Sequence, residues 1–223
     1  MRVIAYTFTC FKDSYLVGML CKSMPKNIEW YVYAGIYGLE PNVEVLLNGS
    51  SNIKYYRADR LEDGTNGFGG TGTLMHLDIL DKLKRDSGFT EEDVLIHLDS
   101  DTYINNTKIF EQAKSCKGIM GILNASSYAI DGGSFTWASG CCITIKGSVY
   151  SCIKNEDIKK NTLFLVSNGI CPSNDVSLSY IGFKNGFEIK PYDISVGRYL
   201  ENVDFVHDTS KDKRITARKL FYE

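Results

Sequence analysis

Short apolar segments recur along the first part of the chain and are separated by longer amphipathic or polar stretches. Val3 to Phe8 and Ile53 to Arg57 are short runs of strand-forming residues, and Ile28 to Tyr37 is rich in aromatic and β-branched side chains, so each run predicts a β-strand. Asp93 to Leu98 is almost continuously apolar, which is typical of a strand that is buried on both faces of a sheet.

The stretches between these runs carry the spacing of helices. A helix is expected to begin at Ser14, whose hydroxyl suits a cap, and to end before Pro25. The glycine cluster from Asn66 to Gly72 leads into a second helix, whose leucines recur every three residues at positions 74, 77, 80 and 83. Strands that alternate with helices in this way favour a sheet with parallel strands.

The second half of the chain has the same elements in less regular order. The patterns predict helices at Thr107–Cys116, Lys154–Thr162 and Asp175–Asn185, strands at Gly118–Asn124, Ser139–Ile145, Phe187–Ile194 and Val203–His207, a loop at Asp131–Ser134, and a basic terminal loop and helix at Lys211–Lys219. We therefore expect an α/β fold: one Rossmann-type, three-layer domain over residues 1–223, with a central sheet that is mostly parallel but mixed.

Composition narrows the class of protein. The chain has 223 residues, of which 43% are hydrophobic and 23% charged, as in an ordinary globular domain rather than a disordered one. With 25 basic and 27 acidic side chains, it has no overall attraction for nucleic acid or acidic membranes. No apolar run approaches the length of a transmembrane segment, and no signal peptide is visible. Seven cysteines without a C-x-x-C pair indicate a reducing compartment, so we expect a cytoplasmic protein, in the host cytoplasm if it is viral.

The candidate chemistry begins at two carboxylates, Asp99 and Asp101, directly after the most apolar predicted strand. If the chain stays extended there, residues two apart share a face and both carboxylates point to one place. Such oxygen ligands suit Mg²⁺ or Mn²⁺, which favours the departure of a phosphate or diphosphate group. A solvated Asp-Ser-Asp turn is the alternative. The spacing excludes an EF-hand loop, and it fits a haloacid-dehalogenase-type phosphatase poorly.

The order of these features resembles that of GT-A-fold glycosyltransferases, in particular family-two-like nucleotide-diphospho-sugar transferases. Four segments carry the resemblance: the glycine-rich stretch Asn66–Thr71, the Asp-x-Asp segment His97–Asp101, the small-residue segment Trp137–Cys142, and Asn174–Tyr180 followed by Gly186–Ile189. Asn174 stands where that family has an acidic residue, and Ile181 falls near its usual arginine, so inverting and retaining transfer both stay open. The resemblance implies a nucleotide-binding half at 1–117, an acceptor-side half at 118–210 and a basic tail at 211–223.

The resemblance also implies roles for single residues. Asp99 and Asp101 would hold Mn²⁺ or Mg²⁺ with the donor's diphosphate, and His207 would be a third metal ligand, unless it is a surface histidine. Asp175 would be the general base, unless it is an ordinary helix cap. The residues implied in donor binding are Thr7, Thr9 and Phe11 near the nucleotide base, and Asn66, Gly69, Gly70, Ser100, Trp137, Lys211 and Lys213 along the rest of the donor.

Several of these residues have an ordinary structural alternative. Trp137 would stack on a sugar or simply fill the core, and the basic residues around Lys213 would neutralise the diphosphate or form a solvated tail. His97 is expected to be a core residue, and His76 is given no role.

These features lead to a hypothesis of metal-dependent transfer of a sugar from a nucleotide-diphosphate sugar, expected to be a UDP-sugar, to an acceptor hydroxyl. The alternatives are a sugar-phosphate nucleotidyltransferase and a non-catalytic nucleotide-sugar-binding module. The acceptor is left open between a glycan, a small molecule, a protein and a modified DNA base. The donor sugar and the oligomeric state are also left open.

Overall fold

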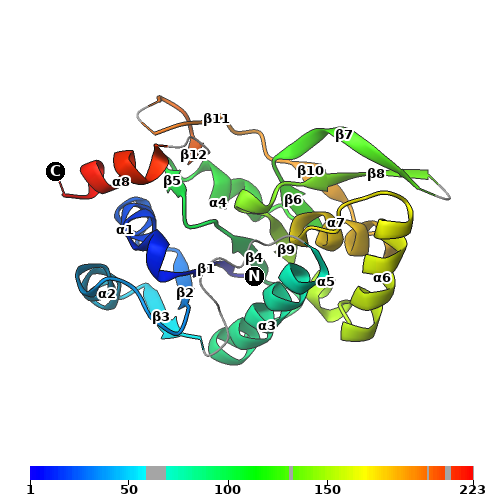
Figure 1. Cartoon of the computed structure of the whole chain (residues 1–223), viewed down its shortest axis with the longest axis horizontal. Coiled ribbons are helices and arrows are strands. Elements are labelled where there is room, and N and C mark those ends of the chain that lie inside the picture. The colour runs from blue at the N-terminus through cyan, green and yellow to red at the C-terminus, as the bar shows by residue number, and fades with distance from the viewer. Residues whose placement is uncertain (59–68, 131–132, 200, 209–211, 223) are drawn as a thin grey trace. The chain divides into compact units, whose positions relative to one another are not determined.

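The computed structural model describes residues 1–58, 69–130, 133–199, 201–208 and 212–222, and it gives the backbone alone at 69–71, 124–126 and 155. The chain divides into two compact units, each made of segments that are distant in the sequence (Figure 1). Unit 1 comprises Met1–Arg2, Thr65–Ile96 and Ala113–Tyr192. Unit 2 comprises Val3–Gly64, His97–Gln112 and Asp193–Glu223.

Helices and strands alternate along most of the chain. The helices are α1 (Ser14–Ser23), α2 (Pro41–Asn48), α3 (Gly69–Ser87), α4 (Lys108–Ala113), α5 (Gly147–Ser151), α6 (Asn155–Ser167), α7 (Asn174–Lys184) and α8 (Lys213–Tyr222). The strands are β1 (Val3–Thr9), β2 (Glu29–Ala34), β3 (Ile53–Arg57), β4 (Val94–His97), β5 (Thr102–Ile104), β6 (Ile119–Gly121), β7 (Leu123–Ile130), β8 (Gly133–Ala138), β9 (Thr144–Lys146), β10 (Ile189–Pro191), β11 (Val196–Gly197) and β12 (Phe205–His207).

Seven of these strands form the central sheet, in the order β10-β6-β9-β4 in unit 1 and β1-β2-β3 in unit 2. The pairs β1–β2, β2–β3 and β10–β6 are parallel, whereas β9 runs antiparallel to both β4 and β6. The expected α/β class, with a mixed, mostly parallel central sheet flanked by helices, is therefore confirmed. The division into functional halves at residue 117 stays a prediction.

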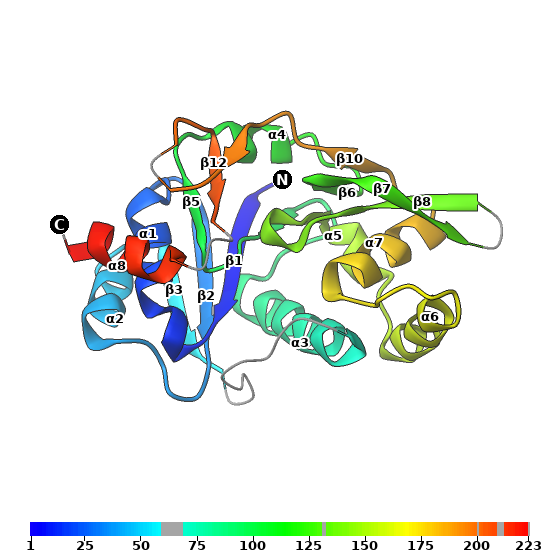
Figure 2. The same ribbon diagram turned by 45° about the horizontal axis from the view of Figure 1, so that its top comes forward.

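Unit 2 packs its largest side chains around β1 and β2. Tyr6, Trp30 and Tyr33 are almost fully buried there, which explains why these strands show as aromatic and aliphatic runs in the sequence. Helices α1 and α8 lie side by side in both views (Figures 1 and 2). A second sheet of three short strands, in the order β11-β12-β5, completes this unit.

Unit 1 combines its part of the central sheet with a hairpin and a helical layer. Strands β7 and β8 pair antiparallel as the hairpin, and α3, α6 and α7 pack on one another. A cluster of Phe135, Leu165, Ile170, Val176 and Tyr180 joins the hairpin to α6 and α7. The hairpin is a departure from the expected topology, because residues 118–145 were expected to contain two strands rather than four.

One local prediction is wrong, one helix was not predicted, and one predicted loop lies partly outside the described residues. Gly140–Cys142 forms a 3-10 turn, so the strand expected from Ser139 begins only at Thr144. Helix α2 was not expected, although Pro41 at its first position is a common helix start. The loop expected at 131–134 overlaps β8, which begins at Gly133, while 131–132 are not described. Within the described part of the chain, we find no helix both long and apolar enough to cross a membrane.

Asp93 ties the N-terminus of the chain to the segment before β4. Its carboxylate accepts hydrogen bonds from the backbone N–H groups of Arg2 (2.7 Å) and Thr90 (2.8 Å), and from the Arg2 guanidinium at 3.1 Å. Burial alone would raise the pKa of Asp93, but these hydrogen bonds and the Arg2 charge outweigh it and lower the pKa to about 2.

Asp93→Asn should therefore destabilise the protein at neutral pH. The folded pKa of Asp93 lies below its unfolded value, so its contribution is complete above pH 4 or so and is lost as the pH falls towards 2. A shift of this size corresponds to about 2 kcal/mol at pH 7. Denaturant unfolding of the wild type and the variant at several pH values measures it, with Glu91→Gln as an exposed control. A difference between wild type and Asp93→Asn that does not shrink at low pH would contradict this account.

Candidate metal centre

Asp99 and Asp101 lie in the turn that connects β4 to β5. The Thr102 backbone N–H and the Thr102 hydroxyl both donate to the Asp99 carbonyl oxygen, at 3.2 and 2.8 Å. These bonds close a tight turn, so the chain is not extended here as the sequence-based argument assumed. The two carboxylates nevertheless approach one another, because the turn, rather than a strand face, brings them together.

His207 reaches this turn through strand pairing. β12 runs antiparallel to β5, and in their register His207 lies opposite Thr102, the residue that follows Asp101. Nε2 of His207 is 3.5 Å from Oδ1 of Asp101 and 3.9 Å from Oδ2 of Asp99. The expectation that His207 joins the two carboxylates is therefore met in the geometry, and all three residues belong to unit 2.

The three side chains fit a divalent cation. Each offers one ligand atom, and these atoms lie within 4.8 Å of one another. Two carboxylate oxygens and one imidazole nitrogen form a donor set that suits Mn²⁺. The two carboxylate oxygens also suit Mg²⁺, which prefers oxygen ligands to nitrogen. Asp99 is half-exposed, with a side-chain exposure of 40%, whereas the Asp101 side chain is only 11% exposed. The open side of the group is therefore at Asp99.

The electrostatics of the group centre on Asp101. Burial alone would raise the pKa of Asp101, but its hydrogen bonds and charge interactions with His207 and Lys213 hold the pKa below its ordinary value. The carboxylate thus stays ionised, as a metal ligand must.

Two residues near this group were not predicted from the sequence. They are Asp208, which is 4% exposed, and Tyr199, whose pKa is raised by burial and by the charges of Asp101 and Asp208. Asp208 directly follows His207, but nothing in the sequence pattern points to Tyr199.

His97 is a core residue, as expected. Its ring stacks on Phe8 at 4.5 Å between centroids and is also close to Tyr6. Its Nδ1 lies 3.8 Å from Oδ1 of Asp99. His97 is therefore a buried residue beside Asp99.

The residues expected near the nucleotide base lie at the end of β1, in the same unit as the carboxylates. Thr7 is fully buried, and its hydroxyl accepts a hydrogen bond from Nε1 of Trp30 at 3.0 Å. The buried hydroxyl of Thr9 has no hydrogen-bond partner among the described residues. Phe11, by contrast, is 42% exposed. Their role in binding the base stays a prediction.

Basic residues from the C-terminal segment also lie in this unit, and two of them, Lys213 and Arg214, are paired with carboxylates. Lys213 contacts the Asp101 carboxylate, and Arg214 donates to Oδ1 of Asp13. The alternative of a tail free in solvent is therefore wrong for these two residues. Lys211 lies outside the described residues.

Asp175 belongs to unit 1 and is the second residue of α7, after a cap at Ser173. Its Oδ2 accepts a hydrogen bond from the backbone N–H of Gly140 at 3.1 Å, and its Oδ1 accepts one from Val176 at 2.9 Å. Nearby, the Asn174 amide is 3.4 Å from Nδ1 of His76. The two motifs 137–142 and 174–180, distant in the sequence, thus meet at Gly140 and Asp175.

The other candidates of unit 1 have mixed outcomes. Trp137 is half-buried in β8, stacks on Tyr128 with ring centroids 6.3 Å apart, and packs on the cluster around Phe135, while its role in donor binding stays a prediction. Gly69 and Gly70 are the first two residues of α3. Asn66 lies outside the described residues, and Ser100 lies in the turn between the two carboxylates.

Comparisons with known proteins agree with this architecture. No family model and no curated protein matches the sequence. Among solved structures, the glycosyltransferase GlyE of Streptococcus pneumoniae TIGR4 matches with a TM-score of 0.55 and 10% sequence identity. The chain has a glycosyltransferase-like fold. The match covers 100% of this chain but 61% of GlyE, so the chain corresponds to less than two thirds of that protein.

The ligand set makes a prediction that separates Mn²⁺ from Mg²⁺. His207→Asn removes the imidazole, a ligand that Mn²⁺ accepts more readily than Mg²⁺ does, so Mn²⁺ affinity should fall by at least about tenfold and Mg²⁺ affinity by less. Isothermal titration calorimetry with each ion measures both. Asp212→Asn, which removes an exposed carboxylate near the N-terminus of α8, is the control. Equal Mn²⁺ affinities for wild type and His207→Asn would exclude His207 from the ligand set.

Proposed function

We propose that this protein is a metal-dependent glycosyltransferase, which moves a sugar from a nucleotide-diphosphate sugar, in our proposal a UDP-sugar, to an acceptor hydroxyl. The observation that carries the proposal is the convergence of Asp99, Asp101 and His207 in a chain with a glycosyltransferase-like fold. A carboxylate–imidazole group of this kind has a clear use in a reaction whose leaving group is a diphosphate.

The proposed site binds the donor through charge. Asp99, Asp101 and His207 would hold Mn²⁺ or Mg²⁺, and the bound ion would act as a Lewis acid that neutralises the departing diphosphate. Lys213, which contacts the Asp101 carboxylate from α8, brings an ammonium group to the same place. An ammonium group close to phosphate oxygens stabilises the charge that develops as the sugar–phosphate bond breaks.

The end of β1 supports the nucleotide part of the proposal. Phe11 is an exposed aromatic side chain, on which a base can stack, and Thr9 has a buried hydroxyl without a hydrogen-bond partner among the described residues. Both residues are in unit 2 with the candidate metal ligands. The other proposed donor contacts are Thr7, Asn66, Gly69, Gly70, Ser100, Trp137 and Lys211.

Asp175 is the proposed general base for the acceptor hydroxyl. It is partly exposed, and its hydrogen bonds from Gly140 and Val176 fix the orientation of the carboxylate. A base must be ionised and held in position to take a proton in the transition state.

Donor hydrolysis tests the proposal without a known acceptor. With Mn²⁺ present, the wild type should slowly release UDP from its UDP-sugar, and Asp101→Asn should lower this rate at least about 100-fold, because the metal site is lost. A panel of nucleotide sugars, assayed with and without Mn²⁺, measures the release, with Asp212→Asn as the control. Diphosphate release from a nucleoside triphosphate and a sugar phosphate would instead indicate a nucleotidyltransferase. Binding of UDP without any turnover would indicate a binding module.

Asp175→Asn separates binding from proton transfer. Because the amide keeps the shape of the side chain but cannot accept the proton, sugar transfer to the acceptor should slow by about 10²- to 10⁴-fold. UDP binding in the presence of Mn²⁺ should not change. Transfer kinetics and UDP calorimetry on the same variant make the comparison. An unchanged transfer rate would remove Asp175 from the role of base and leave the metal site unaffected.

A further inference from the structure

The first residue of α8 places a positive charge against the candidate metal site. The Lys213 ammonium contacts Oδ2 of Asp101, in a pair where the lysine side chain is 28% exposed and the aspartate side chain 11%. The contact is thus largely shielded from water. It joins two positions that are 112 residues apart in the chain.

The two oxygens of the Asp101 carboxylate face different groups. Oδ2 contacts Lys213, whereas Oδ1 is 3.5 Å from Nε2 of His207. The same nitrogen is 3.9 Å from Asp99. Lys213 therefore lies at the edge of the group that would hold the metal, and its charge partly neutralises the Asp101 carboxylate, which lies close to that of Asp99.

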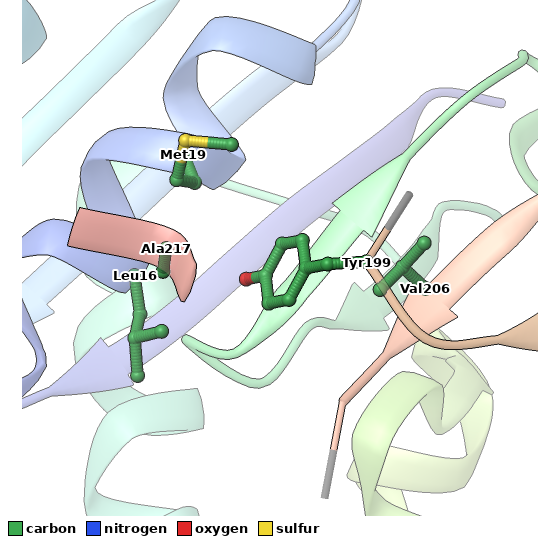
Figure 3. Close-up of a cluster of buried hydrophobic side chains, with 5 residues drawn as sticks. All are labelled: Leu16, Met19, Tyr199, Val206 and Ala217. Atoms are coloured by element: carbon green, nitrogen blue, oxygen red, sulfur yellow. The ribbon is translucent and has the colours of Figure 1, made fainter. Parts of the chain in front are cut away.

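Helix α8 is held in place by contacts that do not involve Lys213. Ala217 is fully buried and packs with Leu16, Met19, Tyr199 and Val206, and Figure 3 shows the Tyr199 ring pointing towards Ala217 and Leu16. On the same helix, Arg214 donates to Asp13. Helix α8 therefore has packing and ion-pair contacts with the rest of unit 2 besides the contact between Lys213 and Asp101.

We propose that Lys213 is an internal counter-ion, which neutralises the carboxylates while the metal is absent and moves to the donor diphosphate when the metal is bound. This inference rests on the proposed function and describes how its site is regulated. Lys213 and a divalent cation on the same carboxylate repel each other, so Lys213 weakens the binding of the metal alone. Once a nucleotide diphosphate is present, Lys213 has an anionic partner of its own. In that state the lysine strengthens the binding of the nucleotide diphosphate.

This model predicts effects of opposite sign on two ligands. Lys213→Met should bind Mn²⁺ alone about tenfold more tightly than the wild type, because a like charge is removed from the site. In saturating Mn²⁺, the same variant should bind UDP about tenfold more weakly, because a phosphate partner is lost. Lys213→Arg keeps the charge and should change both affinities less.

Calorimetric titration of Mn²⁺, and then of UDP in saturating Mn²⁺, tests the model on the full chain. Lys219→Met, which removes the same charge from an exposed position of α8, is the matched control, and thermal unfolding checks that the variants are folded. If Lys213→Met does not fold, Lys213→Gln replaces it. Weaker Mn²⁺ binding by the variant would show instead that Lys213 positions Asp101 for the metal. Unchanged Mn²⁺ or UDP affinity would also overturn the model.

The result is distinguishable from a failure of the proposed function. If Asp101→Asn binds Mn²⁺ as well as the wild type does, the candidate metal site itself is wrong. If Mn²⁺ binding needs Asp101 but does not respond to Lys213→Met, the metal site stands and only the counter-ion model fails.

Discussion

The candidate site depends on one constraint, which is that Asp101 is a carboxylate in a place with little access to water. Its side chain is 11% exposed, and a charge so placed must be compensated by partners that the protein supplies. Here the partners are His207 and Lys213, which follow Asp101 by more than a hundred residues in the chain. The C-terminal segment is therefore an integral part of unit 2. It provides the groups that let the carboxylate stay ionised.

The strand pairing that brings His207 to this carboxylate is short and specific. In the antiparallel register of β12 and β5, His207 lies opposite Thr102, one residue after Asp101. Side chains alternate between the two faces of a strand, so a slip of one residue would turn His207 to the other face. Phe205 and Val206 are both buried, on opposite faces of β12, so such a slip would remove each side chain from its present packing contacts. The packing of a three-residue strand thus fixes the geometry of the ligand set.

The sequence predicted those elements whose pattern is local. The apolar runs of β1 and β4 and the periodicity of α3 lie within a few residues of their predicted bounds, because burial on both faces or on one stripe leaves a direct trace in the sequence. Strand β5 was missed because it has three residues and directly follows the polar turn at Asp99–Asp101. The hairpin of β7 and β8 was missed because its pairing is set by tertiary contacts with the helices of unit 1.

In the candidate site, too, some residues were predictable from the sequence and others were not. Asp99 and Asp101 were found from their spacing after a buried strand, and His207 from a family resemblance. Tyr199 was not found, because its closeness to Asp101 arises only when the chain is folded.

The basic tail shows why the distribution of charge along the chain matters more than the total charge. Lys213 and Arg214 of α8 each pair with a carboxylate of unit 2, and a net charge of -2 conceals this arrangement. Since Arg214 and the buried face of the helix also hold α8 in place, Lys213 is the cation that changes partner in the counter-ion model.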